Sequence, residues 1–248
     1  MTVSPATSRP SETEHAQAVS SMFWRIAGWY DFLNHALSLG QDYYWRNQLV
    51  RMIRPGSTNR VLDLAAGTLD VSLEILRQHQ GVHVTAMDFS QPMLVKGRTK
   101  IKPPLGPHID TVLADGRTLP LASESVDAVT IAFGIRNIVP REQAFEEMFR
   151  VLAPGGRACV LEFGGGGSKI WQGVYALYLE KVLPAVGRLV SGDKGAYRYL
   201  SDTILAFPTP RQLVKEMRRA GFGRVFFRPM LSGIVVIHVA EKPGGVAD

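Results

Sequence analysis

Short apolar runs alternate with amphipathic segments of helical periodicity through the middle of the chain, between residues 60 and 163. The apolar runs are 61–64, 82–87, 109–114, 128–133 and 158–163, and the helical segments are 70–79, 91–101 and 141–152. Strands that are connected through helices pair in parallel, with the helices packed on both faces of the sheet. The pattern therefore predicts an α/β domain built on a parallel sheet. We expect Pro154, Gly155 and Gly156 to end the last of these helices in a turn.

A different pattern closes the chain. A helical segment, 209–220, precedes two apolar runs, 225–230 and 233–240, which are joined by a very short connection. Such a connection favours a β-hairpin. The predicted sheet therefore ends in two antiparallel strands.

Two segments rich in aromatic residues, 23–53 and 168–200, lie outside this alternation, and they hold every Trp and every Tyr of the chain. Tyr and Trp suit a pocket for an apolar ligand with a polar head, because each has an apolar body and a polar tip. The alternative is that these aromatic residues pack accessory helices against the core. The expected organisation is a disordered tail (1–14), a helical cap (15–56), an α/β domain (57–243) with a lid insertion (164–200), and a short tail (244–248).

Composition narrows the class of protein. A chain of 248 residues with 46% hydrophobic and 20% charged residues is ordinary for a globular protein. It has no apolar run of about eighteen residues and no apolar stretch near its start, so we expect neither a transmembrane helix nor a secretory signal. The one cysteine, Cys159, lies in an apolar run and fits a reducing compartment. These features favour a cytoplasmic protein.

The net charge of +6 is too diffuse to indicate nucleic acid by itself. Basic residues nevertheless share one face of the last predicted helix, at positions Arg211, Lys215, Arg218 and Arg219. This face either contacts anionic lipid headgroups at the inner face of a membrane or is simply solvated.

The first apolar run is followed by the pattern of a nucleotide site. The first run contains Asp63 and is followed by small residues up to Gly67. The second run ends directly before Asp88, which lies 21 positions after Gly67. In a βαβ unit such an acidic residue accepts hydrogen bonds from ribose hydroxyls. Only Gly67 of the three dinucleotide-site glycines is present, with Ala65 and Leu69 at the other positions. A ligand without phosphates, such as S-adenosylmethionine, fits this turn; the alternative is a purely structural βα turn.

Polar residues also follow the third and fourth runs. Asp115 and Gly116 are placed to read an adenine amino group, with Met87 as an apolar wall, although Asp-Gly is also an ordinary turn. Arg136 and Asn137 could hold and orient a phenolate or enolate oxygen, or belong to a surface loop.

Other chemistries lack their residues. The six histidines show no metal-ligand spacing, and we expect no metal. There is no G-x-S-x-G nucleophile elbow and no Walker lysine. The four glycines at 164–167 are interpreted as a hinge for the lid insertion.

Several blocks resemble the S-adenosylmethionine-dependent C-methyltransferases of ubiquinone and menaquinone biosynthesis. The blocks are 30–34 (YDFLN), 61–68 (VLDLAAGT), 133–137 (FGIRN), 151–156 (VLAPGG), 161–163 (LEF) and 197–200 (YRYL). The FGIRN and YRYL blocks are the most particular to this family. The resemblance implies a class I methyltransferase fold, with a Rossmann-like seven-stranded sheet, a C-terminal antiparallel hairpin and helical lid segments.

The same resemblance implies roles for individual residues. Thr68 would bind the methionine tail of S-adenosylmethionine, and Asp88 its ribose. Arg136 would stabilise a substrate phenolate, directly or through water, and Asn137 would orient the ring. The remaining implied positions are Asp63, Gly67, Met87, Asp115 and Gly116 at the cofactor, Tyr30 at the substrate ring, and Tyr197 in proton transfer. The family commonly has Gly at position 69 and Ser at position 132, where this chain has Leu and Ala, and Leu69 would narrow the turn.

The implied reaction is C-methylation of a reduced polyprenyl quinone, with demethylmenaquinol favoured over the benzoquinol of the ubiquinone pathway. Expected partners are the quinol and a membrane surface, not nucleic acid, and a homodimer is left open. Three alternatives remain: a paralogue acting on another small acceptor, a non-catalytic scaffold of a quinone-synthesis complex, and a nucleic-acid methyltransferase. The last lacks the Asn/Asp-Pro-Pro-aromatic element expected after the fourth strand.

Overall fold

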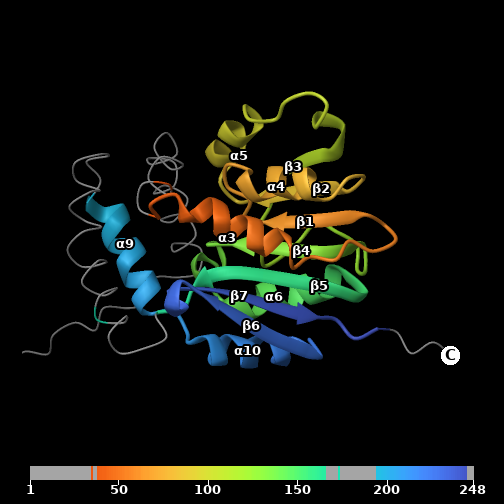
Figure 1. Ribbon diagram of the computed structural model, residues 1–248. Helices are drawn as coiled ribbons and strands as arrows, with labels where there is room; N and C mark the ends of the chain where they lie inside the picture. The colour runs from red at the N-terminus through yellow and green to blue at the C-terminus, as the bar shows by residue number, and fades with distance from the viewer. Residues whose placement is uncertain (1–34, 36–37, 166–172, 174–193, 245–248) are drawn as a thin grey trace, which may run out of the picture.

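The computed structural model describes residues 35, 38–165, 173 and 194–244. These form one seven-stranded sheet in the order β3-β2-β1-β4-β5-β7-β6 (Figure 1). The strands are β1 (Arg60–Leu64), β2 (His83–Asp88), β3 (Ile109–Leu113), β4 (Val126–Ala132), β5 (Leu152–Phe163), β6 (Arg224–Met230) and β7 (Val235–Glu241). Strands β1 to β5 pair in parallel, and β7 lies antiparallel between β5 and β6. The predicted class I methyltransferase sheet with its C-terminal hairpin is confirmed.

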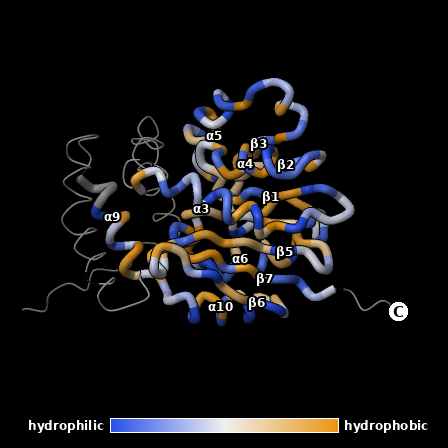
Figure 2. The backbone as a smooth tube through the Cα atoms, viewed as in Figure 1, coloured by the Kyte–Doolittle hydropathy of each residue, from blue (hydrophilic) through white to orange (hydrophobic). Residues whose placement is uncertain are grey.

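Helices pack on both faces of this sheet, as predicted from the alternating pattern (Figure 1). They are α3 (Gln41–Val50), α4 (Asp70–Gln78), α5 (Gln91–Arg98), α6 (Arg141–Val151), α9 (Lys194–Leu205) and α10 (Pro210–Arg219), with short 3₁₀ turns η1 (Gly106–His108), η2 (Ile135–Asn137) and η4 (Leu231–Gly233). One apolar core holds Leu49 of α3 and Ile75 of α4, and the other holds Phe145 of α6 and Leu213 of α10. Figure 2 shows hydrophobic residues concentrated along the central strands between these two layers.

The Pro-Gly-Gly segment differs from its predicted position. Helix α6 ends at Val151, and Pro154, Gly155 and Gly156 lie inside β5, where the pairing with β4 shifts register. Gly155 has φ +79°, and its N–H donates to the carbonyl of Lys242 at 3.1 Å. The segment is therefore a bulge that ties β5 to the end of β7, because a left-handed residue bends one strand of a pair.

The predicted N-terminal tail, the predicted C-terminal tail after its first residue, about half of the predicted cap and most of the predicted lid insertion fall on residues outside the described part of the chain. The boundaries of these units therefore stay predictions. Within the described residues, no helix has the length and apolar character needed to cross a membrane.

Candidate functional site

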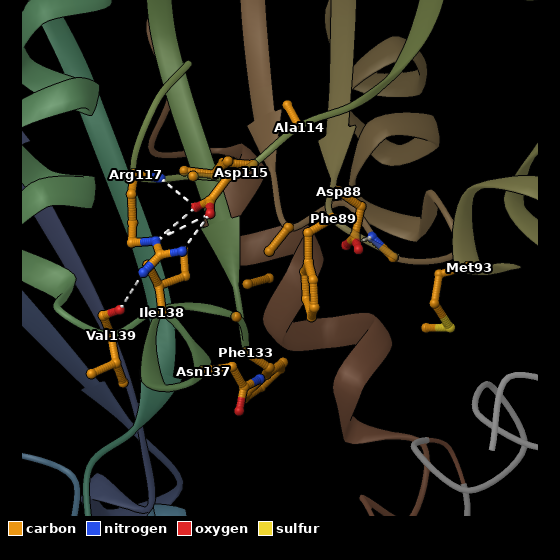
Figure 3. Close-up of a pocket in the computed structure, with 16 residues that line it drawn as sticks. Asp88, Phe89, Met93, Ala114, Asp115, Arg117, Phe133, Asn137, Ile138 and Val139 are labelled. Carbon is orange, nitrogen blue, oxygen red and sulfur yellow. Dashed lines mark hydrogen bonds and ion pairs between the residues drawn. The ribbon is translucent and has the colours of Figure 1, made fainter. Parts of the chain in front are cut away.

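A pocket opens at the carboxyl ends of β1, β2, β3 and β4, where an open α/β sheet binds its ligands (Figure 3). The walls are formed by residues at the end of each strand and just beyond it. They are Leu64, Ala65 and Gly67 from β1 and its turn, Asp88, Phe89 and Met93 from β2 onward, 114–117 after β3, and Ala132, Phe133, Gly134 and 137–139 from β4 onward. Four separate predicted positions, Gly67, Asp88, Asp115 with Gly116, and Asn137, are thus brought to one cavity.

Asp88 is the buried acid of this pocket. Its Oδ2 accepts a hydrogen bond from the Gly67 N–H at 2.8 Å, and its Oδ1 accepts from the Ser90 N–H at 2.7 Å. Burial raises the pKa of Asp88 to about 6 despite these hydrogen bonds, since desolvation disfavours the charged form. Gly67 and Asp88, which the sequence pattern predicted to form one site, are thus in direct contact in the structure.

Asp63 lies behind the β1–α4 turn and does not line the pocket. Its carboxylate accepts hydrogen bonds from Ser72 Oγ at 2.6 Å and from Thr130 Oγ1 at 2.8 Å. Burial raises the pKa of Asp63 to about 6. Because these partners belong to α4 and β4, Asp63 joins β1 to both neighbouring elements and shapes the turn from behind.

Arg136 and Asn137 lie in η2, directly after β4, but in different surroundings. Asn137 lines the pocket. The Arg136 side chain is only 8% exposed, and its Nη1 donates to Glu162 Oε1 at 2.8 Å and to the Phe133 carbonyl at 2.6 Å. Its guanidinium lies 5.4 Å from the centre of the Phe163 ring. Glu162, at the end of β5, is itself buried, and burial raises its pKa.

Two residues at this end of the pocket had no predicted role. Glu162 lies in the LEF block and Tyr199 in the YRYL block. The family resemblance therefore marked both segments, but it assigned no role to either residue. The hydroxyl of Tyr199, in α9, donates to Asn137 Oδ1 at 3.1 Å. Of the other substrate-site predictions, Tyr30 and the side chain of Tyr197 lie outside the described part of the chain.

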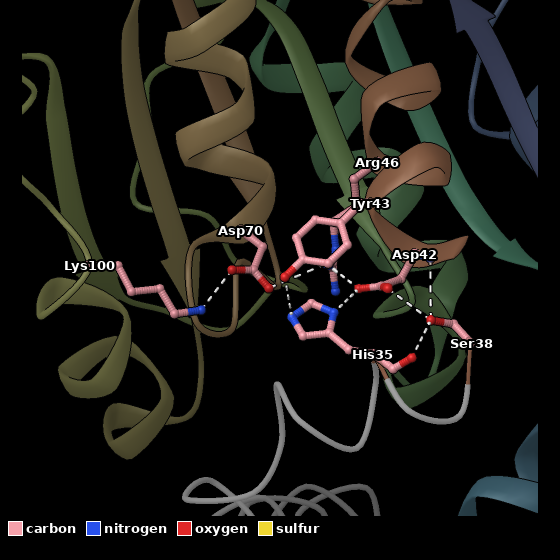
Figure 4. Close-up of polar contacts among 7 residues, drawn as sticks. All are labelled: His35, Ser38, Asp42, Tyr43, Arg46, Asp70 and Lys100. Atoms are coloured by element: carbon pink, nitrogen blue, oxygen red, sulfur yellow. Dashed lines mark hydrogen bonds and ion pairs between the residues drawn. The ribbon is translucent and has the colours of Figure 1, made fainter. Parts of the chain in front are cut away.

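A polar network holds α3 beside the pocket turn (Figure 4). The buried carboxylate of Asp42 contacts His35 Nδ1 and Arg46 Nη1, each at 2.6 Å. Arg46 also lies 3.4 Å from Asp70, the first residue of α4, and Lys100 contacts Asp70 from the far side at 2.6 Å. Since α4 begins directly after the β1 turn, these charges link α3 to one wall of the site. Among the described residues, no group of His, Cys, Asp or Glu side chains is arranged to hold a metal ion.

The model of the ubiE/COQ5 methyltransferase family matches residues 11–242 of this sequence. This chain belongs to that family. A ubiquinone/menaquinone biosynthesis C-methyltransferase of Geobacter sulfurreducens is 43% identical over 232 residues, which cover 93% of this chain and 90% of that protein. A demethylmenaquinone methyltransferase of Thermus thermophilus is 42% identical over 222 residues, covering 90% of this chain and 100% of that protein.

Solved structures with the same fold are more distant in sequence. The cyclase SpnF superposes with a TM-score of 0.69 at 18% identity, over 93% of this chain and 97% of its own. A possible histamine N-methyltransferase from Thermotoga maritima, described as S-adenosylmethionine-dependent, gives 0.63 at 19% identity, over 90% of this chain and 98% of its own. At these identities the likeness shows the fold alone, since one fold hosts many activities.

The cofactor of the ubiE/COQ5 family is S-adenosylmethionine, and the pocket residues fit it. Asp88 supplies a carboxylate for ribose hydroxyls beside a left-handed turn at Gly67, φ +53°. A Cβ added to Gly134 would lie 2.5 Å from Ala65 Cβ, and one added to Gly116 would lie 2.9 Å from Ile138 Cδ1. Glycine at both positions therefore keeps the cavity open. Phe89 projects into it and offers an apolar surface for a purine (Figure 3).

The remaining predicted cofactor positions are placed less directly. The Met87 side chain is buried in the core and does not line the pocket; Phe89 and Met93 are the apolar wall residues after β2. Thr68 is also buried and is not part of the lining. Both oxygens of Asp115 accept hydrogen bonds from Arg117, which lowers the pKa of Asp115 and engages the carboxylate predicted to meet adenine.

Leu69 does not narrow the pocket. It has φ +68°, its side chain is fully buried, and it packs against Gly97 of α5, where an added Cβ would lie 2.5 Å from Leu69 Cγ. The left-handed backbone, which favours glycine, turns the side chain into the core instead of the site. The departure from glycine is thus accommodated by packing. Ala132, the other departure, does line the pocket.

Proposed function

We propose that this chain transfers the methyl group of S-adenosylmethionine to a ring carbon of a reduced polyprenyl quinone. Demethylmenaquinol is the favoured substrate, and the benzoquinol of the ubiquinone pathway is the second. The observation that carries the proposal is one pocket in which Asp88, fitted to the cofactor ribose, shares the cavity with Asn137. The quinone substrates in the names of the Geobacter and Thermus relatives support this choice.

The chemistry needs a nucleophilic ring carbon and a dry, aligned site. When bound, S-adenosylmethionine supplies an electrophilic methyl group on sulfur. A quinol carbon becomes nucleophilic when the neighbouring hydroxyl loses its proton, so the residues must favour a phenolate. Asn137 holds the quinol oxygen by a hydrogen bond, and the Arg136 cation stabilises its negative charge, directly or through water.

The position of Arg136 defines how it could act. Its Nη1 is engaged by Glu162 and Phe133, whereas its buried Nε finds no acceptor among the described residues. A buried donor without an acceptor is costly, which favours a water or substrate oxygen as its partner. Phe133 lines the pocket and packs against Phe163 with ring centres 4.8 Å apart, so aromatic surface excludes bulk water from this region.

We infer in addition that the protein draws its lipid-tailed substrate from a membrane surface. The basic residues of α10, Arg211, Lys215, Arg218 and Arg219, are all exposed. Leu205 at the end of α9 and Leu231 in η4 are exposed apolar residues, 54% and 49% respectively. An anionic surface attracts such cations by about 1 kcal/mol each. Binding to vesicles should therefore need anionic lipid and weaken with salt.

Charge reversal tests this inference. A double variant, Arg211→Glu with Lys215→Glu, should lose binding to anionic vesicles and turnover of the long-tailed quinol, but keep turnover of a short-tailed soluble quinol. Lys102→Glu is the control: it is an exposed charge in the segment after α5, and α5 packs against β3 at one edge of the sheet whereas α10 packs against β6 at the other. Equal vesicle binding by both variants would exclude α10 as the contact.

The reaction itself is tested by mass spectrometry. Wild-type protein, S-adenosylmethionine and reduced demethylmenaquinol or the demethylated benzoquinol are incubated side by side in anionic vesicles. A methylated product from either quinol supports the proposal, and the ratio of products identifies the preferred head group. If the cofactor binds without either product, the paralogue alternative is favoured; if it does not bind, the scaffold alternative is favoured.

A further inference from the structure

Asn137 can serve the proposed reaction only if its amide is held in one orientation. The side chain carries an acceptor, Oδ1, and a donor, Nδ2, which exchange places when the amide rotates. A quinol oxygen that becomes a phenolate needs a donor, and a rotated amide would present an acceptor to it and disfavour the charge. Catalysis by the proposed route therefore requires something to bind Oδ1. This step rests on the proposed function.

The Tyr199 hydroxyl is the group found there. It donates to Asn137 Oδ1 at 3.1 Å, across a sequence separation of 62 residues. Burial raises the pKa of Tyr199, although the nearby positive charge of Arg136 opposes this effect. The phenol consequently keeps its proton at neutral pH and remains a donor, so it favours the amide orientation with Oδ1 toward Tyr199.

The same contact joins two parts of the fold. Tyr199 lies in α9, whereas Asn137 lies in η2 at the carboxyl end of β4, and α9 packs directly on η2. The position of α9 is thus transmitted to the pocket through one hydrogen bond. If α9 moved away, Asn137 would lose the partner that selects its orientation.

We propose that Tyr199 is a positioning residue, which binds Asn137 Oδ1 and thereby directs the Asn137 Nδ2 donor to the substrate oxygen. It acts through Asn137 and does not itself contact the reacting atoms. The Tyr199–Asn137 hydrogen bond thus couples the packing of α9 on η2 to the orientation of the Asn137 amide in the pocket.

The first test is spectroscopic and does not need turnover. In ¹⁵N-labelled protein, the side-chain amide signals of Asn137 are assigned by their loss in Asn137→Ala. They should shift in Tyr199→Phe, which removes only the hydroxyl. They should not shift in Tyr43→Phe, a matched variant in which an exposed tyrosine outside the pocket loses its hydrogen bond to His35. Unchanged Asn137 signals in Tyr199→Phe would overturn the proposal.

The second test is a double-mutant cycle on the quinol reaction. Tyr199→Phe should lower kcat/KM about 3- to 10-fold, as expected for one neutral hydrogen bond, with the Kd for S-adenosylmethionine unchanged. Combined with Asn137→Ala, it should add nothing to the loss caused by Asn137→Ala alone. Additive losses would assign Tyr199 a role independent of Asn137 and refute the inference. If wild-type protein methylates neither quinol, the proposed function fails, while the amide spectrum still decides whether Tyr199 orients Asn137.

Discussion

Leu69 offers a sharp test of how this chain builds its cofactor turn, because two effects of its replacement have opposite signs. The residue combines a left-handed backbone, φ +68°, with a fully buried side chain. Removing the side chain should destabilise the protein, since a buried Leu→Ala change typically costs about 2–5 kcal/mol. Contact with Gly97 places Leu69 between α4 and α5, where little can collapse to fill the space. We expect a loss of about 3 kcal/mol for Leu69→Ala.

Glycine and alanine should then rank in an unusual order. Alanine keeps the left-handed strain of about 1–2 kcal/mol, whereas glycine does not. Glycine instead carries an unfolded-state entropy cost of about 0.5–1 kcal/mol. Leu69→Gly should therefore be at least as stable as Leu69→Ala. At Leu213, which is fully buried within α10, the matched pair should show the usual order, with glycine less stable than alanine by about 1 kcal/mol.

Urea unfolding of the four variants gives the free energies, and calorimetric titration gives their affinity for S-adenosylmethionine. Since Leu69 does not line the pocket, both Leu69 variants should bind the cofactor within about twofold of wild type where they are folded, a difference of about 0.4 kcal/mol. Glycine less stable than alanine at position 69 would refute the left-handed backbone. A large loss of affinity without a loss of stability would refute the direction of the side chain.

Two residues of the pocket, Asp88 and Gly134, give further predictions. Burial raises the pKa of Asp88 to about 6, so its carboxylate gains a proton as the pH falls through 6. Titration calorimetry should therefore show the affinity for S-adenosylmethionine falling by up to about tenfold per pH unit below 6. The Asp88→Asn variant should bind the cofactor weakly, with little dependence on pH. Before cofactor binds, the same raised pKa means that Asp88 contributes stability which is present below pH 3.8 and lost as the pH rises through 6. Gly134→Ala should cost about 1–3 kcal/mol and weaken cofactor binding, because its Cβ would lie 2.5 Å from Ala65 Cβ. Gly244→Ala, where a Cβ meets nothing within 4 Å, should change neither the unfolding free energy nor the affinity.

Periodicity predicted the fold because each strand and helix of the core carries its own apolar pattern. The predicted run 109–114 became β3 (Ile109–Leu113), and the predicted hairpin became β6 and β7. The spacing of Gly67 and Asp88 located the site, because Gly67 lies just beyond β1 and Asp88 ends the neighbouring strand β2. The apolar periodicity of a strand or helix depends only on that segment's own residues, so it can be recognised in the sequence before the fold is known.

The direction in which side chains point at the strand ends was harder to predict from the sequence. Met87 was expected at the cofactor, but side chains alternate along a strand, and Met87 faces the core while Asp88 reaches the pocket. The wall is provided by Phe89, whose position beside Asp88 was the available signal. Asp42 and Arg46 are i, i+4 partners within α3, a spacing that can be read from the sequence. The contact of Arg46 with Asp70 joins separate segments, and no spacing rule predicts it.

The Arg136–Asn137 pair had two interpretations, a functional site or a surface loop, and the buried position of Arg136 argues against the surface loop and supports the proposed site. A surface arginine would be solvated, whereas this side chain is 8% exposed and paired with a carboxylate that is 1% exposed. Burying such a pair brings little stability, because desolvation offsets most of the attraction. Leu69 compensates its strained backbone with apolar packing, whereas the buried Nε of Arg136 lacks an acceptor among the described residues. A charge kept at such cost beside the pocket is better explained by the oxygen it is proposed to stabilise than by the stability of the fold.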